Sequence, residues 1–459
     1  MGTSAPEIFL DIDRGRPRGL RAQIEERLRE AIRSGRLAAG TAVPSTRALA
    51  ADLDVTRKVV VEAYDQLVAE GYLVARPGAA TVVNPAAPRP APADPPPDGG
   101  RDVEVDFRPG RPDLALFPRA AWARASRAAL RATPTGDFAY DDPRGLPRLR
   151  RSLSDYLARV RGVSADPARV IVCAGFAHAF DLILDVLPAR FAVEAPGYPS
   201  PRRQLTDHGV PFDGVPVDDE GIDVAALRRT AARAVHVTPA HQSPTGAVLS
   251  PRRRHELVGW ARDVDGYIVE DDYDAEYRYD RRPVGALQGV APDRVIYCGT
   301  TSKTLASGLR LGWLVVPPPL VEPIVARRHL TDGATSTILQ ATFAEFLDSG
   351  DLDRHLRHTR RVYRERRDAV IASLRQWLPR ATPSGVSAGQ NVLVTLPAGT
   401  DERAVVARAL AAGVRVYPLA DFRPAPNAGD RPGLILGYGS VPAGRAVHGI
   451  RLLSHALGS

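Results

Sequence analysis

The sequence predicts a multidomain protein in which a small α+β unit precedes a larger α/β unit. Its length of 459 residues exceeds what one hydrophobic core usually organises. Residues 85–100 contain seven prolines, a composition that excludes helix and sheet and favours an extended spacer. Downstream, short apolar runs alternate with helical stretches, which is typical of a mostly parallel sheet covered by helices. We therefore expect domains at residues 1–84 and 103–459, joined by a linker at residues 85–102.

The overall charge does not by itself indicate a nucleic-acid partner. The chain has a formal net charge of +8, but residues 1–84 hold twelve basic and eleven acidic side chains. Cys173 and Cys298 each lie in an apolar run, as expected for buried reduced thiols and not for a disulfide framework or a metal site. We find no signal peptide and no apolar stretch of membrane-spanning length. We therefore expect a cytoplasmic protein with no membrane contact.

Two helices joined by a tight turn are predicted by the string VPSTRALAADLDVTRKVVVEAYDQLVAEGYL, after an entry helix with apolar residues at helical spacing through residues 20–32. Ser45 can cap the first of the two helices and Thr56 the second. The second helix begins with Arg57 and Lys58, and a helix that enters the major groove reads bases with its N-terminal residues. The apolar side chains expected to fix the helices and fill their core are Ala48, Leu49, Leu53, Val55, Val60, Tyr64 and Leu67.

Two short strands, residues 72–74 and 81–83, flank a turn at residues 76–78 and predict a β-hairpin wing. Together with the helices, this pattern resembles the GntR-type winged helix-turn-helix over residues 8–84. The resemblance implies that double-stranded operator DNA is a partner. Asp54 departs from the glycine that is usual in the family, and the wing tip reads Gly-Ala-Ala-Thr in place of Gly-x-Gly-Thr. The DNA-binding residues carried over by position are Arg47, Thr56, Arg57 and Lys58, with Arg76 and Gly78 near the minor groove.

In the larger unit, Lys303 is expected in a loop at the end of a strand. It lies in GTTSKTLASGLRLGW, which follows the apolar run RVIYC, and it is one of few lysines in an arginine-rich chain. Nearby, the hydroxyls of Thr300 and Ser302 and the guanidinium of Arg310 can converge on one phosphate, whose oxygens a guanidinium fork matches. A pyridoxal phosphate site requires such a lysine for its Schiff base and such a phosphate cradle.

Acidic residues follow another apolar run, in YIVEDDYDAEYRY, at a strand end where α/β folds place their sites. Asp271 would keep the pyridine nitrogen of the cofactor protonated, and Tyr273 would donate to the ring oxygen. Asp272 is a rival for the first role, and the Asp-x-Tyr spacing favours Asp271.

Two upstream segments complete this set. After the run VIVCAG a helix begins, so the amides of Phe176 and Ala177 can bind phosphate. Tyr198, in EAPGY, is the candidate for stacking on the cofactor ring. In this order the segments resemble fold-type I aminotransferases, and with the upstream module nearly the whole chain resembles the MocR subgroup of GntR regulators.

The resemblance implies several further properties. The expected cofactor is pyridoxal 5'-phosphate, held by Lys303 as an internal aldimine. The larger domain is expected to be an α/β fold-type I aminotransferase-like domain that includes a small C-terminal α+β subdomain. Two copies are expected to form a head-to-tail homodimer with sites near the subunit interface, and a small-molecule effector, either pyridoxal phosphate or an amino compound, is expected to alter operator binding.

Some positions depart from the aminotransferase pattern. His178 stands where related proteins often have glutamine. Ser243, in HQSPTG, replaces the asparagine that contacts the ring oxygen in true aminotransferases, which leaves His241 and Gln242 as substitutes.

The residue that would clamp a substrate carboxylate is missing from its usual place. Aminotransferases place an arginine at the start of a late strand, where GLILGYGS offers Leu434 and only Arg431 lies nearby. Ser200 with Arg202 and Arg203 is another candidate clamp. Because transamination needs accurate holding of the amino acid, weak clamping favours sensing over turnover.

Three functions remain open on the sequence. The first is a transcription regulator whose DNA binding depends on the state of its cofactor. The second is an active aminotransferase with a DNA-binding appendage, and the third is a DNA-compacting protein that no longer binds cofactor. We favour the first.

Overall fold

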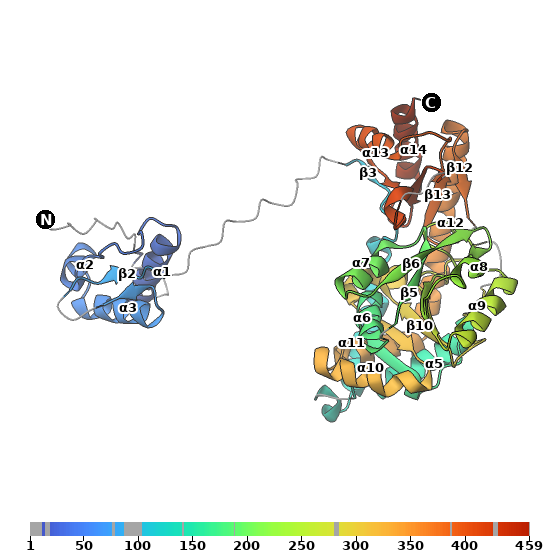
Figure 1. Cartoon of the computed structure of the whole chain (residues 1–459). Coiled ribbons are helices and arrows are strands. Elements are labelled where there is room, and N and C mark those ends of the chain that lie inside the picture. Colours follow the sequence, from blue (N-terminus) through green and yellow to red (C-terminus); the bar gives the residue numbers. More distant parts are fainter. Residues whose placement is uncertain are drawn as a thin grey trace. The chain divides into compact units, whose positions relative to one another are not determined.

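The computed structural model describes residues 12–13, 19–75, 79–86, 103–139, 142–187, 189–279, 284–385, 388–425 and 430–458. These residues belong to two compact units, one within residues 1–100 and one within residues 101–459 (Figure 1). Most of the linker predicted from the prolines, residues 87–102, lies outside the described residues. The same is true of Arg76 and Gly78 at the tip of the predicted wing.

The described part of the N-terminal unit consists of three helices and a two-stranded hairpin. The two strands pair antiparallel, with Leu73 opposite Val83. One core, which includes Ile24, Leu49 and Leu67, holds the helices together. The predicted winged helix-turn-helix is therefore confirmed. Its elements are α1 (Leu20–Arg33), α2 (Thr46–Asp52), α3 (Arg57–Ala69), β1 (Leu73–Val74) and β2 (Val82–Val83).

Of the two predicted helix caps, only the first has the expected hydrogen bond. Ser45 caps α2 as expected, since its side chain accepts a hydrogen bond from the Ala48 amide at 3.2 Å. Thr56 precedes α3, but its side chain makes no capping hydrogen bond within that helix. Ala48 is exposed and not packed between the helices, because Leu49 takes the inner face of this short helix. Asp54 has φ +49°, in the left-handed region where glycine is least strained, which explains the glycine usual at this turn.

Eight strands of the described chain form one sheet at the centre of the larger unit. Adjacent strands run parallel from β10 through β9, β8 and β5 to β6, whereas β11 and β7 run antiparallel to their neighbours. The mostly parallel sheet predicted from the apolar runs is therefore confirmed. In spatial order the strands are β4 (Val170–Cys173), β11 (Gly312–Val315), β10 (Val295–Thr300), β9 (Tyr267–Asp272), β8 (Ala234–Val237), β5 (Phe191–Ala195), β6 (Phe212–Asp218) and β7 (Gly221–Ile222).

Helices cover both faces of this sheet, so the unit has the three layers expected of an α/β fold (Figure 1). α6 (Phe176–Val186) and α10 (Pro318–Thr331) pack on one face, in a core that also contains Cys173 and Cys298. Both cysteines are buried free thiols, as predicted. On the other face pack α8 (Val224–Leu227) and α9 (Pro251–Asp263).

The C-terminal residues form the expected α+β subdomain around a four-stranded antiparallel sheet. Its strands, in spatial order, are β12 (Thr382–Ser384), β13 (Asn391–Thr395), β16 (Gly433–Gly437) and β15 (Tyr417–Pro418). The long helix α12 (Asp351–Trp377) enters this subdomain, and α13 (Glu402–Ala411) and α14 (Ala443–Leu457) pack within it. Additional strand pairing joins β3 (Val105–Asp106) to β14 (Val414–Arg415).

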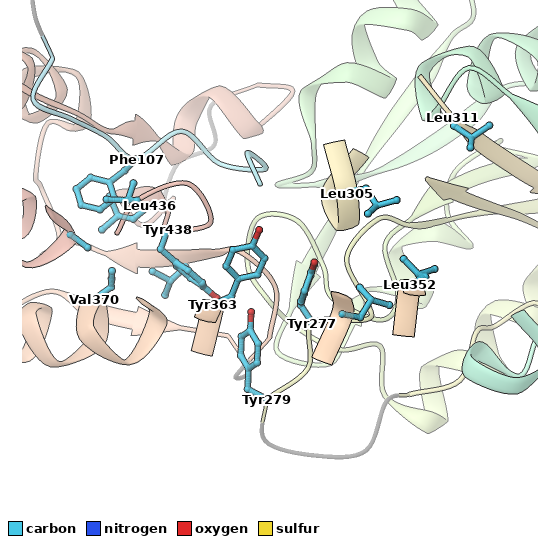
Figure 2. Packing of buried hydrophobic residues seen from close by; sticks show 14 of the residues in the cluster. Phe107, Tyr277, Tyr279, Leu305, Leu311, Leu352, Tyr363, Val370, Leu436 and Tyr438 are labelled. Carbon is cyan, nitrogen blue, oxygen red and sulfur yellow. The ribbon is translucent and has the colours of Figure 1, made fainter. Parts of the chain in front are cut away.

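A row of buried aromatic side chains connects α12 and the C-terminal sheet to the loop after β9. Figure 2 shows Tyr277, Tyr279, Tyr363 and Tyr438 close together, and the rings of Tyr277 and Tyr363 lie 5.0 Å apart between centroids.

The other described elements are α4 (Arg119–Ala132), α5 (Pro147–Arg161), α7 (Pro199–Asp207), α11 (Thr337–Asp348), and the short turns η1 (Leu114–Leu116), η2 (Thr135–Phe138), η3 (Pro167–Arg169), η4 (Ser302–Ala306), η5 (Ser307–Leu309) and η6 (Leu419–Phe422). None of the helices in these ranges combines the length and the apolar character that a membrane span requires.

Candidate functional site

A cavity of about 250 Å³ lies where the carboxyl ends of several parallel strands meet. Residues from distant parts of the chain line it, including residues of the loop after β3 and the first residue of β13. All nine residues that the sequence suggested for cofactor binding line this one cavity, namely Phe176, Ala177, Tyr198, Asp271, Tyr273, Thr300, Ser302, Lys303 and Arg310.

Lys303 lies in η4, a short π-helical turn that follows β10. Its Nζ donates a hydrogen bond of 2.6 Å to the carbonyl oxygen of Gly110, and Gln390 Nε2 donates to the Lys303 carbonyl at 2.8 Å. Gly110 has φ +70°, a backbone conformation that favours glycine, and a Cβ at this position would lie 2.9 Å from Nζ. Burial lowers the pKa of the Lys303 ammonium, against the opposing charges of Asp271 and Asp274.

The structure separates the two neighbouring carboxylates at the end of β9. Successive residues of a strand point to opposite faces, and Asp272 faces away from the cavity. There it accepts hydrogen bonds from Arg161 Nε at 2.7 Å and from the Tyr297 hydroxyl at 2.6 Å. Asp271 lines the cavity, and its Oδ1 is buried without a hydrogen-bond partner among the described residues. Of the two rivals, Asp271 is therefore the one available to a ligand.

His236 is a residue of this site that the sequence reasoning missed. It lies on β8, where its Nε2 is 3.6 Å from Asp271 Oδ2, and its ring packs against Phe176 and Phe180. Burial raises the pKa of the Asp271 carboxyl, and the neighbouring His236 acts in the opposite direction. A histidine inside the otherwise apolar run AVHV was the available signal.

An anion cradle forms around the start of α6. Gly175 precedes this helix with φ +96°, and the first amides of a helix have no partner within it. A Cβ at Gly175 would lie 3.7 Å from Arg310 Nη1 and 4.0 Å from Thr300 Oγ1, so its absence leaves both groups close to the helix start. The Ser302 amide donates to Thr300 Oγ1 at 3.1 Å, which fixes the Ser302 hydroxyl beside that of Thr300. This combination of amides, hydroxyls and a guanidinium suits a phosphate.

Two tyrosines, Tyr198 and Tyr273, form other parts of the cavity wall. Tyr198 lies at the start of α7 with 45% of its surface exposed, as expected for an aromatic ring at the mouth of a cavity. The Tyr273 hydroxyl donates to the His241 carbonyl at 3.1 Å and lies 3.1 Å from His241 Nδ1. Asp274 lies 3.1 Å from the same nitrogen, and both members of this pair are buried. The pair therefore fixes the position of the Tyr273 hydroxyl.

Of the residues considered as replacements for the aminotransferase asparagine, only Ser243 lines the cavity. The expectation for Gln242 was wrong, because its Nε2 donates to Glu194 Oε2 at 3.1 Å and to backbone carbonyls. His241 is likewise held by Asp274. His178 accepts from the Ala174 amide at 3.1 Å and is not part of the cavity wall.

The candidate carboxylate clamps are also corrected. Leu434 points into the main core, and the alternation of β16 places Ile435 beside Phe422, which lines the cavity. Arg202 and Arg203 line a separate pocket of about 390 Å³ with Asp421 and Arg423, whereas Ser200 lines the main cavity. Arg431 is exposed and lies outside the cavity wall. Among the described residues, Arg310 is the one arginine that lines the cavity.

The groups around this cavity fit pyridoxal phosphate. Asp271 offers an unpartnered buried acceptor for a protonated ring nitrogen, the start of α6 and Arg310 offer an anion site, and Lys303 offers a buried amine. Aldehyde, phosphate and basic ring nitrogen are the three features of this cofactor that need such partners.

Two family models match the chain. Bacterial regulatory proteins, gntR family, matches residues 20–83, and Aminotransferase class I and II matches residues 106–423. The chain is 34% identical over 430 residues to the HTH-type pyridoxine biosynthesis transcriptional regulator PdxR of Corynebacterium glutamicum, with coverage of 92% of this chain and 93% of that protein. It is 33% identical over 477 residues to the probable rhizopine catabolism regulatory protein MocR of Rhizobium meliloti, with coverage of 98% and 96%.

A solved structure supports the fold of the larger unit. The kynurenine aminotransferase of Pyrococcus horikoshii, in complex with PMP, aligns with a TM-score of 0.72 at 27% identity, covering 78% of this chain and 91% of that one. An aminotransferase fold joined to a winged helix-turn-helix defines a class of bacterial transcription regulators. The chain belongs to the MocR type within the GntR family. By family, its aminotransferase class I and II fold implies pyridoxal phosphate as the cofactor.

A pair of matched substitutions separates the roles of the two carboxylates. Asp271→Asn is expected to weaken pyridoxal phosphate binding about tenfold, because the amide loses the charge that stabilises a protonated ring nitrogen. Asp272→Asn is expected to lower the free energy of unfolding by about 2 kcal/mol, because Arg161 loses its buried ionic partner. Cofactor titration and denaturant unfolding on both variants check this. The reverse assignment of effects would show that Asp272 faces the ligand.

Proposed function

We propose that this protein binds pyridoxal phosphate in the cavity described above and couples that site to operator DNA. The observation that carries the proposal is the convergence of a buried lysine, an unpartnered carboxylate and an anion cradle in a chain that also contains a GntR-type winged helix. The effector is either pyridoxal phosphate itself or an amino compound. By linkage, the effector must bind one DNA-binding state of the protein more tightly than another, with a coupling of about 1–3 kcal/mol.

When bound, pyridoxal phosphate supplies an aldehyde carbon that reacts with amines and a ring that withdraws electrons. The chain's own residues then have separate tasks. Asp271, with His236 at 3.6 Å from it, would pair with the ring nitrogen. Tyr273 would donate to the ring oxygen in place of the His241 carbonyl, and Tyr198 would cover the ring face. Arg310, Thr300, Ser302 and the amides of Phe176 and Ala177 would hold the phosphate.

The environment of Lys303 favours attachment of the cofactor at neutral pH. An amine attacks an aldehyde only when it is neutral, and burial lowers the pKa of Lys303. Since a lowered pKa keeps the amine neutral at lower pH, the rate of cofactor attachment is expected to fall at a lower pH than the reaction of free lysine with pyridoxal phosphate. Stopped-flow absorbance over a pH series checks this. Coincident profiles would contradict a role for burial.

On the DNA side, Arg47, Arg57 and Lys58 are exposed around the starts of α2 and α3. Arg57 Nε donates to Thr46 Oγ1 at 3.3 Å, which joins the two helix starts. In a head-to-tail homodimer, two such units would bind two operator half-sites. We propose this dimer as the assembly that binds DNA.

Sensing is favoured over turnover by the composition of the cavity wall. The one arginine that lines it among the described residues is assigned to the phosphate, so the described part of the wall offers no second guanidinium for a substrate carboxylate. We therefore expect no repeated transfer of amino groups between an amino acid and a keto acid. Multiple turnovers in such an assay would support an aminotransferase with a DNA-binding appendage.

The experiment that tests the proposal is a footprint on the intergenic DNA beside the protein's own gene, taken with and without pyridoxal phosphate. We expect a protected region whose extent or affinity changes on addition of the cofactor. A footprint that the cofactor leaves unchanged would exclude free pyridoxal phosphate as the effector, and a matching series with amines would then decide whether the site senses at all.

A further inference from the structure

The C-terminal subdomain contributes one hydrogen-bonding side chain to the described wall of the cavity, that of Asn391. Asn391 is the first residue of β13, and the alternation of the strand places it on the same face as Leu393. Leu393 packs with Phe422, which also lines the cavity, whereas Val392 and Val394 face the core on the other side. The position is thus polar on a face that is otherwise apolar.

The carboxamide of Asn391 makes no hydrogen bond to the rest of the described chain, and 8% of the residue stays exposed. A side-chain amide at a cavity wall can pair with water or with a ligand. The remaining exposure of Asn391 is toward cavities, because it lines both the main cavity and an adjoining pocket of about 200 Å³. This arrangement suits a group whose partner arrives with a ligand.

The segment that carries this amide is held rigidly and is linked to the lysine. The Gly389 carbonyl accepts hydrogen bonds from the hydroxyls of Tyr279 at 2.6 Å and Tyr438 at 2.8 Å, two of the tyrosines labelled in Figure 2. Gln390 Nε2 donates to the Lys303 carbonyl. A fixed segment presents its side chain at a defined position, which is what ligand discrimination requires.

The described charged groups of the cavity wall are all used by the cofactor, so none is left to bind the part of an amine ligand that lies beyond its amino group, here called its tail. Among the described lining residues, the Lys303 ammonium, the Asp271 carboxylate and the Arg310 guanidinium are all assigned to the cofactor by the proposed function. Two further arginines, Arg367 and Arg375, line the adjoining pocket and not the main cavity. A carboxylate placed in the main cavity would therefore lose its hydration without gaining a cation from the described residues of its wall.

We propose that Asn391 selects the amine ligand of the cofactor-loaded cavity, and that the tail of this ligand carries a neutral hydrogen-bonding group, a hydroxyl or a carboxamide, instead of a carboxylate. A side-chain amide has one acceptor and two donors, so it pairs with either group. This inference rests on the proposed function, because it requires a bound cofactor. It narrows the open choice of amino compounds to amino alcohols and amino amides.

The test uses the full chain loaded with pyridoxal phosphate and isothermal titration with four amines of matched length: propanolamine, β-alaninamide, β-alanine and propylamine. We expect the alcohol and the amide to bind about tenfold more tightly than the other two, the size of one well-made hydrogen bond. In Asn391→Leu this preference should disappear, while propylamine binding stays the same. Thr395→Val, at the other end of the same strand, is the matched control and should keep the preference.

Each other outcome overturns the inference. Equal affinity for all four amines, no binding of any amine, or a preference that survives in Asn391→Leu would remove Asn391 from ligand selection. Preference for β-alanine would show that a cationic group binds the carboxylate of the ligand. Failure of the proposed function is visible beforehand and separately, since the unliganded chain would then develop no visible absorption band on addition of pyridoxal phosphate.

Discussion

Replacement of Lys303 by alanine is expected to abolish the visible absorption band that the chain develops with pyridoxal phosphate. The buried amine is the nucleophile that the aldehyde requires, and no other described side chain of the cavity can take its place. Noncovalent binding through the phosphate cradle should persist with reduced affinity. Operator binding by this variant should no longer respond to the cofactor. Absorbance titration and a gel-shift series with and without pyridoxal phosphate measure the two effects.

The second lysine of the chain provides the control for this experiment. It contains only two lysines, Lys58 and Lys303, one in each unit. Lys58→Ala should keep the absorption band unchanged, because Lys58 lies on the exposed start of α3. Reduction with borohydride followed by peptide mapping should label only the peptide that contains Lys303. A band that persists in Lys303→Ala, or a label on Lys58, would refute the assignment.

The sequence was sufficient for those parts of the site whose residues follow a strand. Lys303 and Asp271 each come after an apolar run, and parallel strands bring such loops to one edge of the sheet. The start of α6 was visible for the same reason, since Gly175 separates a strand from a helix. The Asp-x-Tyr spacing also favoured Asp271, which is the member of the acidic pair that lines the cavity, whereas Asp272 is occupied by Arg161.

Other parts of the site depend on contacts that no local pattern contains. The hydrogen bond between Lys303 and Gly110 joins residues 193 positions apart, and Asn391 reaches the cavity from another sheet. The error at Leu434 was one of register, because a shift of one residue exchanges the two faces of a strand. Distant pairing of this kind is set by tertiary packing, which a single sequence read segment by segment does not display.

The double substitution Arg47→Ala with Arg57→Ala is expected to weaken operator binding about a hundredfold near 0.15 M salt, since each lost arginine contact costs roughly 1–3 kcal/mol. Both side chains are exposed beside the helix starts, so the fold of the N-terminal unit should be retained. If they contact phosphates, the slope of log affinity against log salt should also fall by about two.

The matched control is Arg27→Ala with Arg36→Ala, which removes the same charge from a half-buried position in α1 and from an exposed position in the loop that follows it. Because these two arginines lie away from the starts of α2 and α3 in sequence, the control should lose much less affinity than the test variant. Fluorescence anisotropy with operator DNA at several salt concentrations measures both quantities. Equal losses in the two variants would mean that net charge alone attracts DNA, and that α3 does not read the operator in the way a GntR-type recognition helix does.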